Sequence, residues 1–205
     1  MKIALFGATG TLGAPLLERA LGRGHEVTAL VRTPAKVSAE DPALTVVAGD
    51  VTDATAVARL VAGQDAVVNA VGGAGDIRRV ATAAIVAGMR ETGCDRLVNL
   101  GGAGLLRLGP WPLYRLPVFP KAMVPVTLEH RHVRGLLEDS GLRWTLVCPG
   151  FMAPGSSSGG YLARTDRAYL RGGRQLPVTA VAEFILDELE QPSFVGRLVA
   201  IRAAH

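Results

Sequence analysis

The feature that most constrains this chain is a loop with regularly spaced glycines that begins at the seventh residue. The loop follows a short apolar run at residues 2–6 and precedes an amphipathic segment. Glycines allow a tight turn and a close approach of the backbone to a diphosphate, and the next helix offers amide groups and a positive dipole end. The alternative is a glycine turn that only shapes the chain. The order of strand, loop and helix favours a dinucleotide site, with these residues around the diphosphate: Gly7, Thr9, Gly10, Thr11, Leu12 and Gly13.

Apolar runs alternate with helical patterns along the whole chain. We expect strands at residues 2–6, 25–31, 44–48, 66–71, 96–100, 144–148 and 197–201, and helices at 15–22, 53–60, 77–91, 126–139 and 179–190, with Asp53 as an N-cap. Strands made almost wholly of Val, Leu and Ile indicate a parallel sheet covered on both faces. Right-handed crossovers predict a single α/β domain over residues 1–205, a doubly wound Rossmann sheet ordered 3-2-1-4-5-6 with a seventh strand.

Two segments interrupt this alternation. Residues 104–125 are rich in Pro, Leu and aromatics, and residues 153–176 are rich in Gly, Ser and Arg. Both follow strands, so we expect them at the carboxyl edge of the sheet as substrate loops. Six side chains could form an apolar pocket or could anchor the loops to the core: Trp111, Tyr114, Phe119, Met123, Phe151 and Met152. Four arginines could hold an anionic substrate or could be solvated: Arg164, Arg167, Arg171 and Arg174.

The end of the second predicted strand indicates which dinucleotide binds. An NAD site usually has an Asp or Glu there for the ribose hydroxyls, whereas this chain has Leu30-Val31-Arg32-Thr33. Arg32 can pair with the 2′-phosphate of NADP(H), Thr33 can add a hydroxyl and Lys36 can add charge. The alternative is a solvated surface arginine. We expect NADP(H) as the cofactor.

Composition and charge exclude several classes of protein. Apolar residues make up 49% of the chain, which suffices for a full core, and the net charge of +4 is spread without the basic clusters of a nucleic-acid-binding protein. No apolar stretch has the length of a membrane span and no signal peptide is visible, so we expect a cytoplasmic protein whose partner is a small-molecule substrate. Cys94 and Cys148 have no metal-site spacing, so we expect no metal and two inert thiols. The oligomeric state stays open.

Several motifs together resemble the atypical short-chain dehydrogenase/reductases. They are the glycine loop with Leu30-Val31-Arg32, the stretches 48–53 and 68–72, and the stretch 140–150. The chain is most similar to the small NAD(P)H-binding reductases that include biliverdin-IXβ/flavin reductase and the NmrA-like proteins, and the run 126–130 followed by 140–142 resembles the flavin-reductase branch. The resemblance implies adenine contacts from Asp50 and Val51. It implies further cofactor contacts from these residues: Asn69, Ala70, Val71, Gly72, Leu100, Gly101, Pro149, Gly150 and Phe151. On the residues alone, Asp50 could instead be a loop or capping residue, and Asn69 could be a turn-stabilising side chain.

The chain departs from that family at the proton donor. The tyrosine–lysine pair of the usual short-chain dehydrogenases is missing, because Val118 and Thr165 stand four residues after Tyr114 and Tyr161. Gly102 stands where the flavin-reductase branch has a serine. The candidate catalytic residues are His130, as a general acid or a substrate-orienting group, and then Tyr114. Either could instead have only a structural role.

Three functions fit these observations. The first is an NADPH-dependent oxidoreductase that reduces a small carbonyl, quinone or flavin-like substrate by hydride transfer. The second is a non-catalytic NADP-binding sensor of the NmrA-like kind, which the missing tyrosine–lysine pair favours. The third is a nucleotide-sugar epimerase or dehydratase, which the short chain disfavours.

Overall fold

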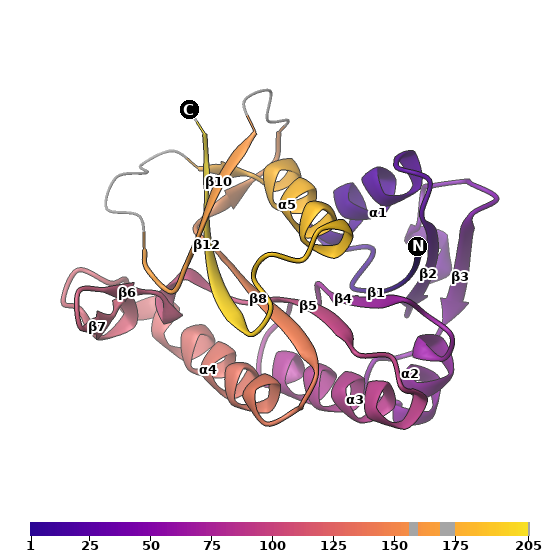
Figure 1. Ribbon diagram of the computed structural model, residues 1–205, viewed down its shortest axis with the longest axis horizontal. Helices are drawn as coiled ribbons and strands as arrows, with labels where there is room; N and C mark the ends of the chain where they lie inside the picture. Colours follow the sequence, from indigo (N-terminus) through magenta and orange to yellow (C-terminus); the bar gives the residue numbers. More distant parts are fainter. Residues whose placement is uncertain (156–159, 169–174, 205) are drawn as a thin grey trace.

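A computed structural model describes residues 1–155, 160–168 and 175–204 as an α/β protein built on one large sheet (Figure 1). The sheet has eight strands in the order β10-β12-β8-β5-β4-β1-β2-β3. Their bounds are β1 Lys2–Phe6, β2 Glu26–Val31, β3 Leu44–Ala48, β4 Ala66–Asn69, β5 Arg96–Leu100, β8 Arg143–Pro149, β10 Tyr161–Thr165 and β12 Arg197–Ala203. All neighbours are parallel except the antiparallel pair β10 and β12. The predicted doubly wound order 3-2-1-4-5-6 is confirmed, and the seventh predicted strand, β12, lies beside the sixth, β8.

In the described part of the chain, five α-helices cover the two faces of this sheet (Figure 1). They are α1 Gly13–Gly22, α2 Ala54–Val61, α3 Ile77–Thr92, α4 Val124–Glu138 and α5 Val178–Glu190. Helices α1 and α5 pack together on one face, while α2, α3 and α4 lie side by side on the other. This three-layer arrangement follows from the crossover connections between parallel strands, which place a helix on one face or the other after each strand.

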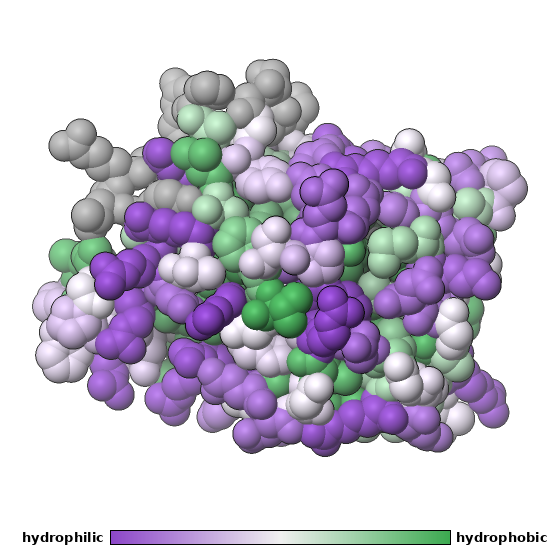
Figure 2. Space-filling model, viewed as in Figure 1, coloured by the Kyte–Doolittle hydropathy of each residue, from purple (hydrophilic) through white to green (hydrophobic). Residues whose placement is uncertain are grey.

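The apolar core is divided into two halves by the sheet. Ile3 and Leu5 of β1 belong to the half beneath α1 and α5, and Ala4 and Phe6 belong to the half beneath α2, α3 and α4. This alternation is what the two-residue repeat of a strand requires when both faces are buried. In the view of Figure 2, hydrophilic side chains cover the outer surfaces of the helices, and apolar atoms show between the two helical layers.

The helix that starts after Asp53 begins as predicted. The Asp53 carboxylate accepts hydrogen bonds from the backbone amides of Thr55 at 2.9 Å and Ala56 at 3.2 Å. These bonds satisfy amides that have no partner within the helix.

Among the described residues, none of the helices combines the length and apolar character that crossing a bilayer requires.

Strand β10 was not predicted, because it lies within the segment 153–176 that the composition suggested to be irregular. It pairs with β12 at the edge of the sheet, with Tyr161 opposite Ala203 and Thr165 opposite Val199. The remaining short elements are β6 Arg107–Leu108, β7 Trp111–Pro112, β9 Met152–Ala153, β11 Leu176–Pro177 and the 3₁₀ turns η1 Pro34–Lys36, η2 Ala103–Leu105, η3 Leu113–Arg115 and η4 Lys121–Met123.

The two interrupting segments contact each other. The backbone amide of Arg107 donates to the carbonyl of Asp166 at 2.8 Å, and the amide of Ala168 donates to the carbonyl of Arg107 at 2.9 Å. Within the second segment, β11 runs parallel to β9. These bonds tie the first segment to the end of β10, so both segments are attached to the same end of the sheet.

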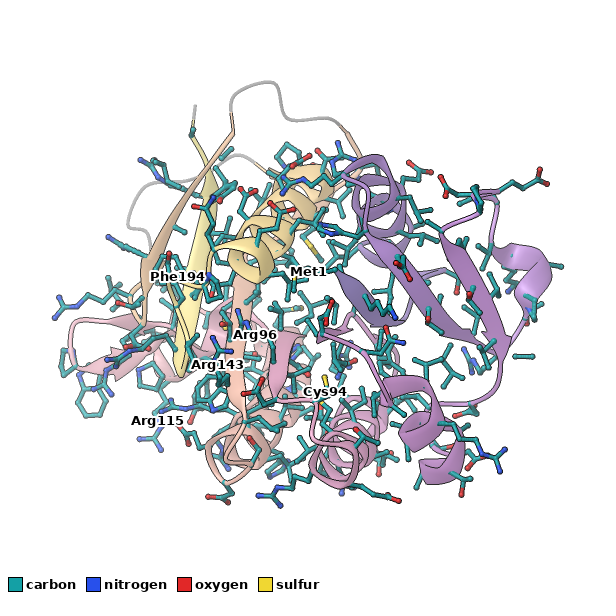
Figure 3. All side chains as sticks on the ribbon, turned by 45° about the vertical axis from the view of Figure 1, so that its right-hand side comes forward. Met1, Cys94, Arg96, Arg115, Arg143 and Phe194 are labelled. Atoms are coloured by element: carbon teal, nitrogen blue, oxygen red, sulfur yellow. The ribbon has the colours of Figure 1, made fainter. Side chains whose placement is uncertain are left out.

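A buried ion pair lies at the opposite, amino edge of the sheet. Arg96, the first residue of β5, donates through Nη2 to Oε1 of Glu188 in α5 at 2.9 Å, and the two side chains are 4% and 1% exposed. Thr145 also donates to this carboxylate oxygen at 2.9 Å. Figure 3 shows Arg96 in the interior beside Arg143 of the neighbouring strand. Because this network is remote from the carboxyl edge, its role is to join sheet and helix.

Candidate cofactor and substrate site

A large cavity lies along the carboxyl ends of β1, β2, β3 and β4. Its volume is about 590 Å³. It is lined by Phe6, Gly7, Thr9, Gly10, Leu30, Val31, Arg32, Gly49, Asp50, Val51, Ala70, Val71, Gly72, Gly73, Ala74 and Ile77. The crevice outside the carboxyl ends of parallel strands is where doubly wound sheets bind nucleotides. Nine of the residues expected to contact a cofactor are therefore brought together here: Gly7, Thr9, Gly10, Arg32, Asp50, Val51, Ala70, Val71 and Gly72.

The glycine loop forms one wall of this crevice, and two of its positions require glycine. Gly7 has a φ of +85°, and a Cβ there would lie 2.7 Å from the carbonyl carbon and oxygen of Ala70. A Cβ at Gly13 would lie 1.9 Å from the carbonyl oxygen of Gly7. The loop is thus folded onto itself and onto the β4 turn, and α1 starts directly behind it without a capping side chain. A diphosphate fits this cradle, since an uncapped helix end attracts an anion.

The side chains of the other three predicted loop residues, Thr11, Leu12 and Gly13, do not line the cavity. Thr11 is exposed, and Leu12 is buried in the core at 3% exposure. Gly13 is also buried, so only its backbone faces the loop. Any contact of Leu12 and Gly13 with a diphosphate would therefore come from their backbone.

Arg32 and Asp50 line the crevice together, just after β2 and β3. The Asp50 carboxylate accepts hydrogen bonds from the amide and hydroxyl of Thr52 at 2.9 and 2.8 Å. These bonds, and then the positive charge of Arg32, lower the pKa of Asp50. Thr33 and Lys36 are exposed beyond Arg32 and do not line the cavity. Arg32 is thus the cation that the structure brings to this end of the crevice.

Asn69, the last residue of β4, stabilises the turn that follows this strand and that lines the crevice. Its side chain is 3% exposed and donates to Asn99 Oδ1 at 2.7 Å and to Thr82 Oγ1 at 3.2 Å. Its Oδ1 accepts a hydrogen bond from the amide of Val71 at 3.1 Å. Asn69 therefore fixes the turn after β4, and the turn residues beyond it line the cavity.

A second cavity of about 250 Å³ adjoins the first at Gly72. It is lined by Gly72, Arg78, Leu100, Gly101, Gly102, Ala103, Gly104, Phe119, Pro120, Met123, Val126, Thr127, His130, Pro149, Gly150, Phe151 and Met152. Five residues expected beside the cofactor's nicotinamide end are among these: Leu100, Gly101, Pro149, Gly150 and Phe151. The walls are mainly apolar, so this cavity suits a small organic substrate held next to a cofactor.

Of the two predicted substrate loops, the first contributes to this pocket. Phe119 and Met123 line it, whereas Trp111 is 55% exposed outside it. Among the described residues of the second segment, 153–155, 160–168 and 175–176, none lines the pocket. Arg164 and Arg167 lie near the end of β10, and Arg171 and Arg174 lie outside the described residues.

His130 of α4 is the buried titratable side chain of the second cavity, beside the buried hydroxyl of Thr127. It is 7% exposed, and its Nδ1 is buried without a hydrogen-bond partner among the described residues. Burial, and then the positive charge of Arg78, lower the pKa of His130 from 6.5 to about 4. The imidazole is therefore neutral near pH 7, with one N–H to donate and one nitrogen to accept.

Gly102 explains how the imidazole fits. A Cβ at Gly102 would lie only 2.8 Å from Cδ2 of His130. The ring thus occupies the space into which a side chain at position 102 would extend. A side chain at position 102 would therefore require the imidazole of His130 to move.

Tyr114, the second catalytic candidate, is not brought to either cavity. It lies in η3, and its hydroxyl accepts a long hydrogen bond of 3.5 Å from Nη1 of Arg131. This bond lowers the pKa of Tyr114. Tyr114 lines neither of the two cavities, so its catalytic role stays a prediction that this geometry does not support.

Arg78 is a site residue that the sequence reasoning missed. It is the second residue of α3, lines the second cavity, and donates through Nη1 to the carbonyl of Gly73 at 2.6 Å. The sequence contained a signal for this residue, because an arginine in the first turn of a helix lies unfavourably at the positive end of the helix dipole.

The two cysteines lie as expected. Cys94 and Cys148 are free and buried, and burial raises the pKa of each thiol. In the described part of the chain, no three His, Cys, Asp or Glu residues gather as a metal site.

Fold and crevice together define a dinucleotide-binding protein of the Rossmann type. Residues 7–192 match the family model for NAD(P)H-binding, and the chain belongs to this family. The resemblance to the atypical short-chain dehydrogenase/reductases is thereby confirmed.

Relatives cover nearly the full chain. The YwnB protein of Bacillus subtilis is 33% identical over 203 residues, which span 94% of this chain and 93% of that protein. A candidate epimerase from Bacteroides thetaiotaomicron has a structure with a TM-score of 0.89 at 31% identity, covering 100% of this chain and 98% of the other. A candidate NADH-flavin reductase from Streptococcus pneumoniae has a TM-score of 0.84 at 26% identity, covering 99% of each chain.

Proposed function

We propose that this protein is an NADPH-dependent oxidoreductase that reduces a small carbonyl, quinone or flavin-like substrate. The observation that supports this most is the apolar cavity of about 250 Å³ that adjoins the cofactor crevice at Gly72. A substrate there would lie beside the nicotinamide end of the cofactor. When bound, the cofactor supplies a hydride to the substrate.

The residues of the chain hold and orient the two molecules. The loop between Gly7 and Gly13 and the start of α1 bind the diphosphate, and Arg32 binds the 2′-phosphate. Phe119 and Met123 form an apolar wall that excludes water from the substrate side.

His130 orients the substrate as a hydrogen-bond donor. With a pKa of about 4, its imidazole has no dissociable cationic proton to transfer at neutral pH. A neutral imidazole N–H can still polarise a carbonyl oxygen. We therefore assign His130 to substrate orientation, and we infer that the proton of the reduced product comes from solvent.

The preference for NADPH is tested by removing the charge of Arg32. The Arg32→Gln substitution should weaken NADPH binding roughly tenfold and leave NADH binding nearly unchanged, because an exposed charge-assisted hydrogen bond contributes about 1–2 kcal/mol. The matched control is Lys36→Gln, which removes the same charge from a residue outside the cavity. Dissociation constants come from nicotinamide fluorescence. Equal wild-type affinity for both cofactors, or an unchanged preference in Arg32→Gln, contradicts the assignment.

Turnover is tested by NADPH oxidation against a panel of ketones, quinones and flavins. Reduction of at least one of these classes of substrate supports the oxidoreductase.

A second candidate function is a non-catalytic NADP-binding sensor. One observation favours it: His130 is neutral and Tyr114 lies outside the pocket, so neither residue supplies an acid there. Saturable NADPH binding with no acceptor reduced would establish the sensor.

A further inference from the structure

The second cavity contains an arginine, Arg78, that forms no ion pair with a carboxylate of the described residues. Arg78 donates to a backbone carbonyl, that of Gly73, at 2.6 Å. In the described part of the chain, no carboxylate oxygen lies within 4.0 Å of its guanidinium. Its neighbour Arg79 differs, because it pairs with Asp76 at 2.7 Å. The two adjacent arginines of α3 therefore have different surroundings, one paired at the surface and one available to a ligand.

The position of Arg78 is electrostatically unfavourable without an anion. It stands in the first turn of α3, where the aligned peptide dipoles present positive charge. That turn contains no acidic residue, and the carboxylate of the N-cap residue Asp76 pairs with Arg79 and not with Arg78. Partial burial lowers the pKa of Arg78, and the charge of Glu129 offsets this only in part. A negatively charged group beside the guanidinium would relieve both effects.

The cavity gives that group a location and a chemical context. Arg78 is the charged side chain of this mostly apolar pocket, and His130 is a titratable side chain in the same pocket. Nδ1 of His130 is buried without a hydrogen-bond partner in the described residues. Arg78 also lines a hollow of about 460 Å³ that adjoins the pocket and opens beside Glu129. A ligand that fits this arrangement combines an apolar body, a carbonyl oxygen for the imidazole, and an anionic group for the guanidinium.

We propose that Arg78 is a specificity-determining residue that binds the carboxylate of the substrate, and that the substrate class is an apolar ketone bearing a carboxylate. This inference rests on the proposed reductase function for the ketone, whereas recognition of the anion by Arg78 is measurable without turnover. Arg78 binds the substrate and transfers no proton. Its planar guanidinium can hold a carboxylate through two parallel hydrogen bonds.

The binding test uses benzoate and benzamide, which have similar shapes and differ in charge. Calorimetric titrations are performed on the protein in saturating NADP⁺. Benzoate should bind the wild-type protein roughly tenfold more tightly than benzamide, since a hydrogen bond to a charged group contributes at least a factor of this size. Arg78→Gln should abolish the difference, Arg78→Lys should restore part of it, and the control Arg79→Gln should preserve it. Equal affinities in the wild type, or a preference that persists in Arg78→Gln, overturns the proposal.

The turnover test uses phenylglyoxylate and its methyl ester with NADPH. Arg78→Gln should raise KM for the acid roughly tenfold and leave KM for the ester nearly unchanged. A reductase without the Arg78 subsite would reduce both ketones, with parallel effects of the substitution on the two KM values. Absence of reduction of both ketones, together with a benzoate preference that depends on Arg78, would instead contradict the ketone as the substrate class and retain the anion subsite. Thermal unfolding of each variant verifies that it is folded.

Discussion

Because His130 is buried, we predict that the free energy of unfolding depends on pH in a way that can be measured. The pKa of His130 is lowered from 6.5 to about 4 in the folded protein, first by burial and then by the charge of Arg78. Between these values the unfolded chain binds a proton that the folded protein does not bind. The free energy of unfolding therefore falls as the pH decreases through this window and keeps its full value above about pH 6.5.

The size of the effect follows from the difference between the two pKa values. It corresponds to about 3 kcal/mol of stability lost between about pH 6.5 and about pH 4. Other groups also titrate in this range, so the measured quantity is the difference between the wild type and His130→Gln. That variant lacks the titrating group, and its stability should fall less steeply with decreasing pH.

The assay is urea unfolding, followed by circular dichroism, at several values between about pH 7.5 and about pH 4.5. The matched control is His132→Gln, two residues along the same helix, whose wild-type side chain is 53% exposed. It should reproduce the wild-type pH dependence. Parallel curves for the wild type and His130→Gln would refute the reasoning, because they would show that His130 titrates alike in the folded and unfolded states.

Two further predictions concern the sheet and the loop. Arg96→Met should lower the free energy of unfolding by about 3–5 kcal/mol in urea titrations, because it leaves the Glu188 carboxylate buried without its cation; a loss below about 1 kcal/mol would contradict the role of this pair. Gly13→Ala should abolish measurable NADPH binding in fluorescence titrations, because the new Cβ would lie 1.9 Å from the carbonyl oxygen of Gly7. Gly22→Ala, where a Cβ meets nothing within 4 Å, is its control and should bind NADPH normally; unchanged binding by Gly13→Ala would show that the loop is not the cradle.

The sheet could be predicted from the sequence because its signals are local. The run Lys2–Phe6 is a strand buried on both faces, and Asp53 caps a helix through its own carboxylate. The order of the strands then follows from the handedness of the crossovers. The helix α4 begins at Val124, two residues before the expected start, with Pro125 in its first turn where the missing amide costs no hydrogen bond.

Strand β10 could not be predicted because its pairing is not local. Its five residues, Tyr161–Thr165, stand in a region of Gly, Ser and Arg and acquire order by pairing with β12 at the sheet edge. The hydrogen bond from the Tyr161 hydroxyl to Asp187 of α5, at 2.6 Å, is equally invisible in the sequence.

In the two cavities as well, local features could be predicted from the sequence and non-local features could not. The glycine loop and Arg32 were recognisable from their spacing after predicted strands. The fit of His130 against Gly102 joins residues far apart in the sequence, and the lack of an ion pair between Arg78 and the described residues depends on which carboxylates the fold brings near it. Such features arise from packing between α3, α4 and β5, so they become visible only in three dimensions.

The central claim is that a nicotinamide dinucleotide occupies the crevice outside the carboxyl ends of β1, β2 and β4. Its most direct test is a fluorescence titration of the purified wild-type protein with NADPH and, separately, with NADH. We predict saturable binding at a single site, with NADPH bound roughly tenfold more tightly. Absence of saturable binding for both dinucleotides would contradict the account.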